Sequence, residues 1–273
     1  MDYRELSAPT LDGLIEKLQL RLNVHATAAT REWWTKYLRG AASFRGVKMA
    51  DVREAVHAWF RQERLGEYLS VGQQKELALM LLKVDYSEDK LAGILFFQEI
   101  LLPARALDWR SDLPRFARLF EQGYICDWST CDWFCVKVLG PLVEQQGEAC
   151  ARAISGWREA NSMWQQRASV VAFANLAGEG DQHFLDFTEM VLDNCTQLLG
   201  NRERFAQTGV GWILRELSRW DQGRIVEFIE TNLDRFSREA VKNAVKYLPP
   251  EVAEHLLRAH LLSGNRVLRR NLR

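Results

Sequence analysis

The sequence predicts an all-α protein, built as an α-solenoid of stacked antiparallel helix pairs of the HEAT-like type. Apolar residues recur at helical spacing almost throughout the chain, and strand-like alternation with Asn-Gly or Asp-Gly hairpin turns is absent from the sequence. The helical segments are numerous and short, which favours stacked helix pairs over a bundle of a few long helices. Because no linker is long enough to separate independent parts, we expect residues 1–273 to form one domain.

The order of the expected helices follows from the apolar stripes, in which residues three and four positions apart share one helix face. The stripes cover Leu11–Leu22, Val52–Phe60, Leu91–Leu102, Phe134–Val143, Phe184–Leu199, Val210–Leu217 and Val252–Leu262. Pro103, Pro249 and Pro250 are expected to mark helix boundaries, and Pro141 to kink or end the helix in which it falls.

Three serines are expected to cap helices. Ser162 begins a Ser-x-x-Gln capping box. Ser87 is followed by two acidic residues, as suits an N-cap with acids in the first turn. Ser129, three residues before Asp132, approximates a capping box, so we expect a helix to begin near Ser129.

The bulk composition is that of a globular protein that can bury a core, with 47% hydrophobic and 26% charged residues. The longest apolar runs fall well short of the roughly 20 residues that a membrane-spanning helix needs. The N-terminus has no basic segment followed by an apolar core, so we expect no secretory signal. These observations predict a cytoplasmic protein that does not contact a membrane.

The formal net charge is zero, but the charges are unevenly distributed. The 36 basic residues are 27 Arg and 9 Lys, and Arg is the better bidentate partner for phosphate and carboxylate groups. The residues after His255 include five arginines and no acid. A neutral chain with such segments can carry a basic face, although surface ion pairs would also account for the composition.

The five cysteines are Cys126, Cys131, Cys135, Cys150 and Cys195. An odd number of cysteines in a chain without a secretory signal predicts reduced thiols. The first three lack the paired Cys-x-x-Cys spacing of a zinc site. We therefore expect no metal site and no cofactor.

The segment Tyr124–Val143 combines two Asp-Trp pairs with three of the cysteines. The stripe expected to face the core comprises Cys131, Cys135, Val138 and Leu142. Asp132 lies beside that stripe in the first helical turn, where the helix dipole favours an anion, and Trp128 stands about one turn away. Asp132 is then either a helix-capping acid or a half-buried functional carboxylate, whereas Asp127 and Trp133 are expected to be structural.

Two further side chains leave alternatives open. Arg167 lies next to the buried stripe of its helix, and a partly buried Arg needs an anion, either in an internal ion pair or in a bound phosphate. Trp212 falls off the core stripe of its helix, on the side that bears Arg215 and Arg219. It either packs against the neighbouring repeat or offers a surface to an aromatic or sugar partner. Gly209 and Gly211 would let another backbone approach closely.

Together these segments resemble the AlkD family of DNA alkylation-repair glycosylases, which has a HEAT-like helical fold. Blocks typical of the family occur in its order over about residues 26–246. They are Tyr37 with Phe44-x-Gly46, Trp128-x-x-x-Asp132, Trp164-Gln-Gln-Arg167-Ala168, Gly211-Trp212-x-Leu-Arg215-Glu216 and Ser237-Arg-Glu-Ala-x-Lys242. The arginine-rich C-terminal extension lies beyond these blocks, and Trp133 directly after Asp132 departs from the family pattern.

The resemblance implies a concave face that binds double-stranded DNA containing alkylated purines. It further implies hydrolysis of the N-glycosidic bond of cationic N3- or N7-alkylated purines, without flipping the base into a pocket as most glycosylases do. The catalytic residues that it implies are Asp132, Trp128 and Trp212, with the Asp132 carboxylate stabilising the oxocarbenium-like sugar. The DNA-binding residues that it implies are Arg167, Tyr37, Lys48 and Arg215.

Two alternatives from other functional classes stay open at this point. The first is a non-catalytic HEAT-like protein that binds damaged or branched DNA by shape, which the excess of Arg and the C-terminal Arg cluster favour. The second is a protein scaffold, which the zero net charge and the helical repeats favour. We expect a monomer with no obligate protein partner.

Overall fold

A computed structural model describes the backbone of residues 10–270 and the side chains of residues 10–263. Within residues 10–270 the chain is helical and holds no β-strand, only an isolated bridge between Ser43 and Tyr86. No helix in this range combines the length and apolar character of a membrane span. The side chains of the C-terminal Arg266, Arg269 and Arg270, and the whole of Arg273, lie outside the described residues.

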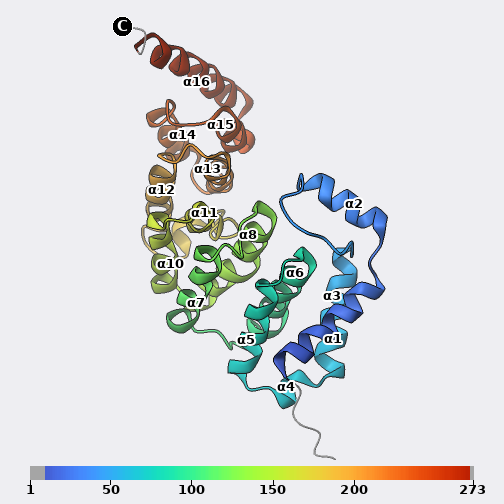
Figure 1. Cartoon of the computed structure of the whole chain (residues 1–273). Helices are drawn as coiled ribbons and strands as arrows, with labels where there is room; N and C mark the ends of the chain where they lie inside the picture. The colour runs from blue at the N-terminus through green and yellow to red at the C-terminus, as the bar shows by residue number, and fades with distance from the viewer. Residues whose placement is uncertain (1–9, 271–273) are drawn as a thin grey trace, which may run out of the picture. The chain divides into compact units, whose positions relative to one another are not determined.

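The chain divides into two compact units. Unit 1 comprises the residues up to Leu107 together with Gln122–Trp133, and unit 2 comprises Asp108–Glu121 together with the residues from Phe134 onward. We describe each unit separately. Figure 1 shows the helices of both.

Unit 1 consists of short helices around an aliphatic and aromatic core. Its helices are α1 (Leu11–Val24), α2 (Ala28–Tyr37), α3 (Met49–Gln62), α4 (Leu65–Tyr68), α5 (Val71–Leu82), α6 (Ser87–Phe96) and the π-helix η1 (Phe97–Leu101). The chain then forms the first helix of unit 2 and returns to unit 1 for most of α8 (Trp128–Phe134). Helix α3 packs against α1 and α6, and α5 packs against α6. Leu18, Trp59 and Phe96 are fully buried at these contacts.

Helix α2 differs from its neighbours in unit 1 because it buries none of its residues. Its N-terminus is well formed, since the Thr27 side chain accepts the N–H of Thr30 at 3.2 Å. Trp33 and Tyr37 nevertheless stay about half exposed, at 57% and 50%. A helix that keeps large aromatic side chains at the surface is a candidate binding element.

Unit 2 continues the pattern of short helices. Its elements are α7 (Trp109–Glu121), η2 (Cys135–Leu139), α9 (Gly140–Gln146), α10 (Glu148–Ser155), η3 (Gly156–Glu159), α11 (Met163–Val171), η4 (Gly180–Gln182), α12 (Phe187–Leu198), α13 (Arg204–Leu217), α14 (Gln222–Thr231), α15 (Arg238–Ala244), η5 (Val245–Tyr247) and α16 (Pro250–Arg270). Helices α11, α13 and α15 pack in succession, and α10, α12 and α14 contact them from one side (Figure 1). This arrangement is the predicted stacking of helix pairs.

The details of the helix boundaries test the expectations from the sequence. Ser162 caps α11 as expected, with its hydroxyl accepting the N–H of Gln165. Ser87 was wrongly expected to be a cap, because Tyr86 is the N-cap of α6 and Ser87 is its first helical residue. Pro141 lies where the π-helix η2 passes directly into α9, so the helical path continues through it and the wider π turn precedes the residue that has no N–H to donate.

The closest helix contact in unit 2 lies between α13 and α15. A Cβ atom placed on Gly211 would lie 2.4 Å from the carbonyl oxygen of Ala240 and 3.0 Å from its Cα atom. Both residues are fully buried. Only glycine therefore permits this separation, which confirms the expectation that another backbone approaches Gly211.

We expect Gly211→Ala to lower the free energy of unfolding by about 1–3 kcal/mol, because the methyl group must push α15 away from α13. Urea denaturation followed by circular dichroism measures the change. Gly156→Ala is the matched control in the same unit, since a Cβ atom at Gly156 has open space and the backbone there has an ordinary φ of −58°. Equal stabilities of the two variants would contradict this account of the α13–α15 contact.

Candidate functional site

Helix α8 begins at Trp128 because the Asp127 side chain caps it. The Asp127 Oδ1 atom accepts the N–H of Thr130 at 2.9 Å, and Oδ2 accepts the Thr130 hydroxyl at 2.7 Å. The expectation that Ser129 caps this helix was therefore wrong, since Ser129 lies within the first turn. Asp127 is buried and structural, as expected. Asp132 is the fifth residue of α8 and so lies outside the capping-box position.

The cap fixes where Trp128 and Asp132 lie on α8. They are four residues apart in one helix and therefore about one turn apart on the same side. Both side chains are half-buried. The cysteines behave as packing residues, because Cys131 and Cys135 are fully buried, as the core stripe predicted.

Three aromatic rings of unit 1 form a continuous row at the surface. The Trp128 ring meets the Tyr37 ring edge to face, with ring centroids 5.2 Å apart. Tyr37 stacks on Trp33, again at 5.2 Å between centroids but at an interplanar angle of 9°. We call Trp33, Tyr37 and Trp128 the aromatic row. It ends one helical turn from the Asp132 carboxylate.

The segment between α2 and α3 is held by one buried carboxylate. Glu88, at the start of α6, is 1% exposed. Its Oε1 atom accepts the N–H groups of Gly46 and Val47 at 2.8 and 3.0 Å, and its Oε2 atom accepts the N–H of Arg45 at 2.9 Å. The glycine is required here, since Gly46 has a φ of +100° and a Cβ atom would lie 2.3 Å from the Thr27 carbonyl oxygen.

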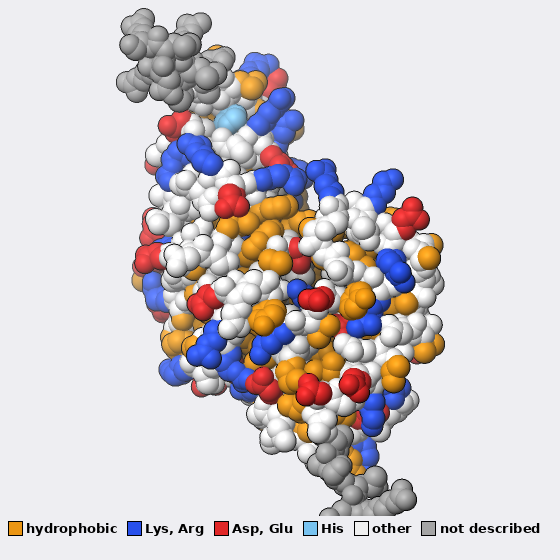
Figure 2. Space-filling model, viewed as in Figure 1, with side chains coloured by type: hydrophobic (Ala, Val, Ile, Leu, Met, Phe, Trp, Pro, Cys, Tyr) orange, Lys and Arg blue, Asp and Glu red, His pale blue; other side chains and the backbone are white. Residues whose placement is uncertain are grey.

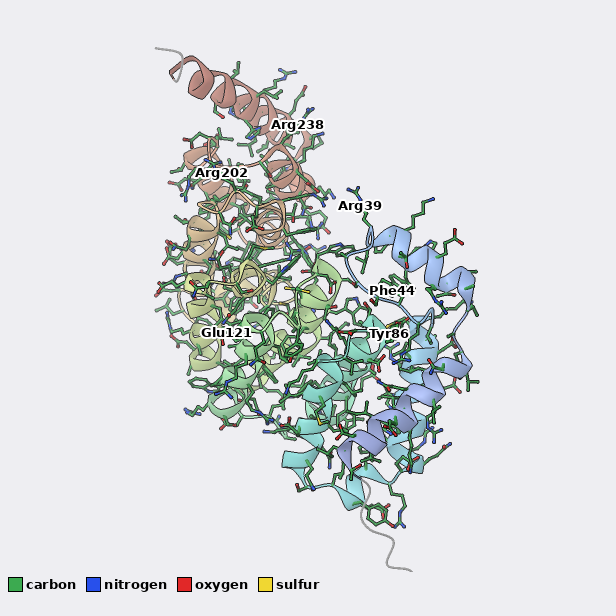
Figure 3. The ribbon with its side chains drawn as sticks, in the orientation of Figure 1. Arg39, Phe44, Tyr86, Glu121, Arg202 and Arg238 are labelled. Atoms are coloured by element: carbon green, nitrogen blue, oxygen red, sulfur yellow. The ribbon has the colours of Figure 1, made fainter. Side chains whose placement is uncertain are left out.

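A buried ion pair strengthens the same attachment. The Arg45 Nε atom lies 2.6 Å from Oδ2 of Asp89, whose side chain is fully buried. The Arg45 guanidinium also stacks over the Tyr86 ring, 4.3 Å from its centroid. Phe44 and Tyr86, on the two sides of this attachment, are labelled in Figure 3. Helix α2 and its aromatic side chains are thus connected to α6 through residues 44–47.

Lys48 follows this segment and is the N-cap residue of α3. Its side chain is exposed and lines an open hollow together with Trp33 and Trp34. An ammonium group beside exposed indole rings suits contact with a phosphate next to a stacked base. The structure therefore brings the predicted Lys48 close to the aromatic row.

Arg167 lies at the contact between α11 and α13 in unit 2. Its side chain is buried, and Nη1 donates to the Phe205 carbonyl oxygen at 2.6 Å and to the Thr208 hydroxyl at 3.3 Å. Gly209 makes room for it, because a Cβ atom there would lie 3.1 Å from Nη1. The expectation that another backbone approaches Gly209 was therefore wrong, since the nearest atoms belong to the side chains of Arg167 and Val170. The guanidinium is thus fixed to the backbone of the next helix.

Trp212 and Arg215 lie three residues apart on α13, and therefore on the same side of the helix. Trp212 is half-buried, whereas the core stripe of α13, including Ile213 and Leu214, is fully buried as predicted. The Arg215 guanidinium contacts the Glu216 carboxylate at 2.6 Å and the Tyr247 ring at 5.3 Å from its centroid.

A second arginine shares the exposed Tyr247 ring. Arg219 lies 4.5 Å from the ring centroid. Exposed basic residues continue along α15 and η5, namely Arg238, Lys242 and Lys246. Figure 2 shows Lys and Arg side chains gathered over this part of unit 2, and Figure 3 labels Arg238 there. No local pattern pointed to Tyr247, because the cation–aromatic contacts of its ring join residues that are 28 or more positions apart.

The predicted site residues therefore fall into two sets. Unit 1 brings together Tyr37, Lys48, Trp128 and Asp132, and unit 2 holds Arg167, Trp212 and Arg215. Reasoning from the sequence missed Trp33 in the first set and Tyr247 in the second. The only signal for Trp33 was its spacing of four residues from Tyr37, which places two aromatic rings on one helix face.

The residues that the structure describes include no group of three or more His, Cys, Asp or Glu side chains that could hold a metal ion. Four of the five cysteines are buried, and only Cys126 is exposed. Burial raises the pKa of the Cys150 thiol to about 12. All five are free thiols.

Comparisons with known proteins agree with this picture. The model of a protein family described as DNA alkylation repair enzyme matches residues 18–248. A solved structure described as a predicted DNA alkylation repair enzyme from Enterococcus faecalis superposes with a TM-score of 0.68 at 15% sequence identity, covering 83% of this chain and 98% of that one. At this identity the likeness concerns the fold alone. No curated protein gives a significant match.

We expect Glu88→Gln to lower the free energy of unfolding by about 2–4 kcal/mol, because one oxygen acceptor for backbone N–H groups becomes an amide donor in a buried site. Urea denaturation measures the change in the free energy of unfolding. Glu67→Gln is the matched control, since Glu67 is exposed in the same unit and its ion pair with Arg64 is at the surface. An unchanged stability of Glu88→Gln would contradict the anchoring role.

We expect native protein to react rapidly with Ellman's reagent at one thiol, that of Cys126, and at five thiols in denaturant. Burial keeps the other four from the reagent and holds the Cys150 pKa far above the pH of the assay. Absorbance at the thiolate product band counts the thiols. Cys126→Ser should remove the fast phase, and any fast thiol in this variant would contradict the burial of the other four.

Proposed function

Because this chain belongs to the family of DNA alkylation repair enzymes, we propose that it is a DNA glycosylase for cationic N3- and N7-alkylated purines in duplex DNA. It hydrolyses the N-glycosidic bond while the lesion stays in the duplex. The observation that carries the proposal is the half-buried Asp132 carboxylate, one helical turn from Trp128 at the end of the aromatic row. The order of the blocks over residues 26–246 supports the same assignment.

The main requirement of this reaction is stabilisation of the positive charge that develops on the sugar, because the cationic purine is already a good leaving group. The C1′–N bond breaks with its electron pair moving to the purine, which neutralises the positive charge of the alkylated ring. The sugar then carries a developing positive charge, and a fixed carboxylate stabilises that charge more strongly in the transition state than in the substrate. Water adds to C1′, and its proton passes to solvent or to the Asp132 carboxylate acting as a base. The products are a neutral alkylpurine and an abasic site.

The aromatic side chains fit the same reaction. The face of Trp128 would line the sugar and the cationic base, where a ring quadrupole favours a positive charge. Tyr37 and Lys48 would lie against the DNA on the side of unit 1. Trp212 is proposed as a lesion-facing aromatic on unit 2, where its half-buried ring keeps some surface for a contact with DNA.

Binding to DNA would draw on unit 2 as well. Arg215 and Arg219 flank the Tyr247 ring, and three exposed basic residues continue from it. Such a surface binds phosphates without reading sequence, as lesion search requires. Arg167 is proposed as a phosphate contact, and its bond to the Phe205 carbonyl oxygen would orient its guanidinium.

We expect wild-type protein to release 7-methylguanine from a duplex and Asp132→Asn to release it about 10²–10³-fold more slowly, because one preorganised electrostatic group is removed. Chromatography of the released base under single-turnover conditions measures the rate. Asp85→Asn, at an exposed carboxylate of the same unit, should leave the rate unchanged.

Salt-dependent DNA binding with no base release by wild type would instead support the non-catalytic alternative. Release at the wild-type rate by Asp132→Asn would remove the proposed role of the carboxylate. DNA binding that is lost in Arg219→Gln and kept in Arg61→Gln, at an exposed arginine of α3 in unit 1, would place the phosphate contacts on unit 2.

A further inference from the structure

An open hollow lies beside helix α2 in unit 1. Its volume is about 360 Å³, and its lining residues are Ala29, Thr30, Trp33, Trp34, Lys48 and Met49. Sites for small organic groups begin at roughly 300 Å³, so the hollow has room for one flat ring and the groups attached to it. The reaction proposed above at Asp132 assigns no role to Trp33 or Trp34.

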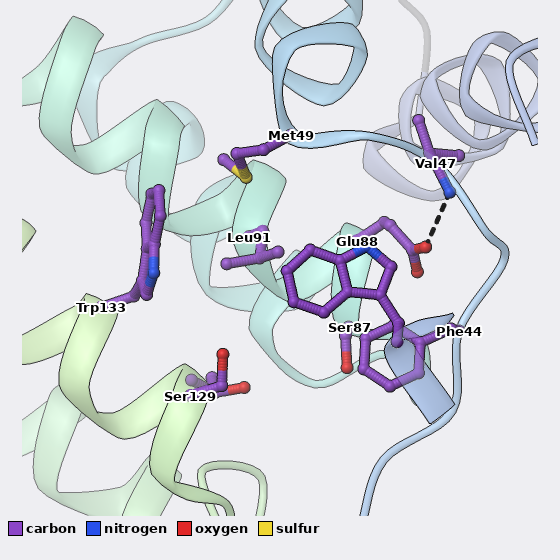
Figure 4. A pocket seen from close by; sticks show the side chains of 10 residues that line it. Phe44, Val47, Met49, Ser87, Glu88, Leu91, Ser129 and Trp133 are labelled. Carbon is purple, nitrogen blue, oxygen red and sulfur yellow. Dashed lines mark hydrogen bonds between the residues drawn. The ribbon is translucent and has the colours of Figure 1, made fainter. Parts of the chain in front are cut away.

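Trp34 separates this hollow from a smaller cavity in unit 1. The smaller cavity has a volume of about 80 Å³, which is well below the usual size of a site for an organic ring. Trp133 lies on one side of it and Phe44 on the other (Figure 4). Trp34 lines both spaces, and its ring stacks on Phe44 at an interplanar angle of 11°. This stacking holds Trp34 in place as the inner wall of the hollow.

Trp33 forms the outer wall and keeps much of its ring in solvent. Tyr37 stacks on one face of the Trp33 ring, yet Trp33 is still 57% exposed. The Trp33 and Trp34 rings meet at an interplanar angle of 81°, so the two indoles form a corner. A planar ring that stacks on one of these indoles meets the other with its edge, and both contacts are favourable between aromatic rings.

The chain around the hollow is strongly basic. Residues 26–48 include five basic residues and one acid, Glu32. One of the five, Arg45, is held in the ion pair with Asp89. The other four are exposed, namely Arg31, Lys36, Arg39 and Lys48, and Figure 3 shows Arg39 extending from the end of α2. Positive charges spread along α2 exceed what a single phosphate needs, so they complement a chain of phosphates.

Exposed indoles beside these charges select a single strand over a duplex. Each base of a duplex is stacked between its neighbours, so an indole reaches a base face only after the base has been unstacked at a cost in free energy. The base faces of a single strand are accessible, and any base can stack on an aromatic side chain. The Lys48 ammonium in the same hollow would then meet the phosphate next to the stacked base.

We propose that the hollow and the basic residues of α2 bind a single strand of DNA. One base stacks on Trp33 in the corner made with Trp34, and the adjoining phosphate contacts Lys48. The proposal goes beyond the proposed function, which concerns a purine that stays in a duplex, and rests on it only for the choice of DNA over RNA. The site directs the protein to DNA in which a stretch of unpaired strand adjoins the duplex.

The test is a titration of fluorescein-labelled oligothymidine with the full chain, followed by fluorescence anisotropy. We expect saturable binding that Trp33→Leu weakens about tenfold or more, whereas Trp33→Phe, which keeps a stacking ring, weakens it about threefold or less. Lys48→Gln should lower the slope of log affinity against log salt concentration by about 0.7. Tyr68→Leu, at an equally exposed ring of unit 1, is the matched control and should bind as wild type. Circular dichroism establishes that each variant is folded.

The outcomes separate this proposal from the proposed function. Base release from duplex DNA together with no binding of oligothymidine overturns the single-strand proposal alone. Binding of oligothymidine by a chain that releases no base supports the single-strand site and overturns the glycosylase proposal. Tighter binding of oligouridine than of oligothymidine overturns the choice of DNA.

Three further results would remove the single strand from α2. The first is an equal loss of affinity for oligothymidine and for duplex in Trp33→Leu. The second is oligothymidine binding that Arg219→Gln abolishes and Trp33→Leu leaves unchanged, which would move the strand to unit 2. The third is a dimer in sedimentation analysis that Trp33→Leu dissociates, because the hollow would then seat a second copy of the chain.

Discussion

The interaction on which unit 1 depends is the buried Glu88 carboxylate with its three backbone N–H donors. Burying a charge is costly unless hydrogen bonds compensate for it. Here the compensation comes from residues 45–47, more than 40 positions earlier in the chain. The carboxylate therefore fixes the segment after α2 to α6. Since α2 buries none of its own residues, this attachment determines where Tyr37 and Trp33 present their rings.

In unit 2, small residues and a buried cation set the positions of neighbouring helices. Gly211 lets α13 approach α15, and Gly209 makes room for the Arg167 guanidinium between α11 and α13. Both glycines belong to the same helix, two residues apart, on either side of the core position Val210. Trp212 follows Gly211 directly in the chain and therefore lies beside both of these close contacts. The family blocks around Arg167 and Trp212 are therefore packing determinants of the stack as well as candidate DNA contacts.

The sequence predicted the all-helical fold, the core stripes of α8 and α13, and the close approach at Gly211, because these depend on local periodicity and residue size. It predicted the caps less well. Asp127 and Ser129 are both acceptable N-cap residues by type, and the structure has the Asp127 side chain accepting the Thr130 N–H. The role of Glu88 and the division into two units depend on contacts between distant residues, for which a single sequence has no pattern. The roles of the predicted site residues stay predictions.

Helix α8 presents two different sides, because successive residues of an α-helix are rotated about the helix axis. Trp128 and Asp132 share one side, and Ser129 and Trp133 share a side about 100° away. The first side meets the aromatic row, and the second lines the cavity with Ser129 at its edge. One cap at Asp127 fixes the rotation of both. A change of register in this short helix would displace the Asp132 carboxylate from the proposed reaction and Trp133 from the cavity wall together. The capping hydrogen bonds of Asp127 therefore determine the position of both side chains.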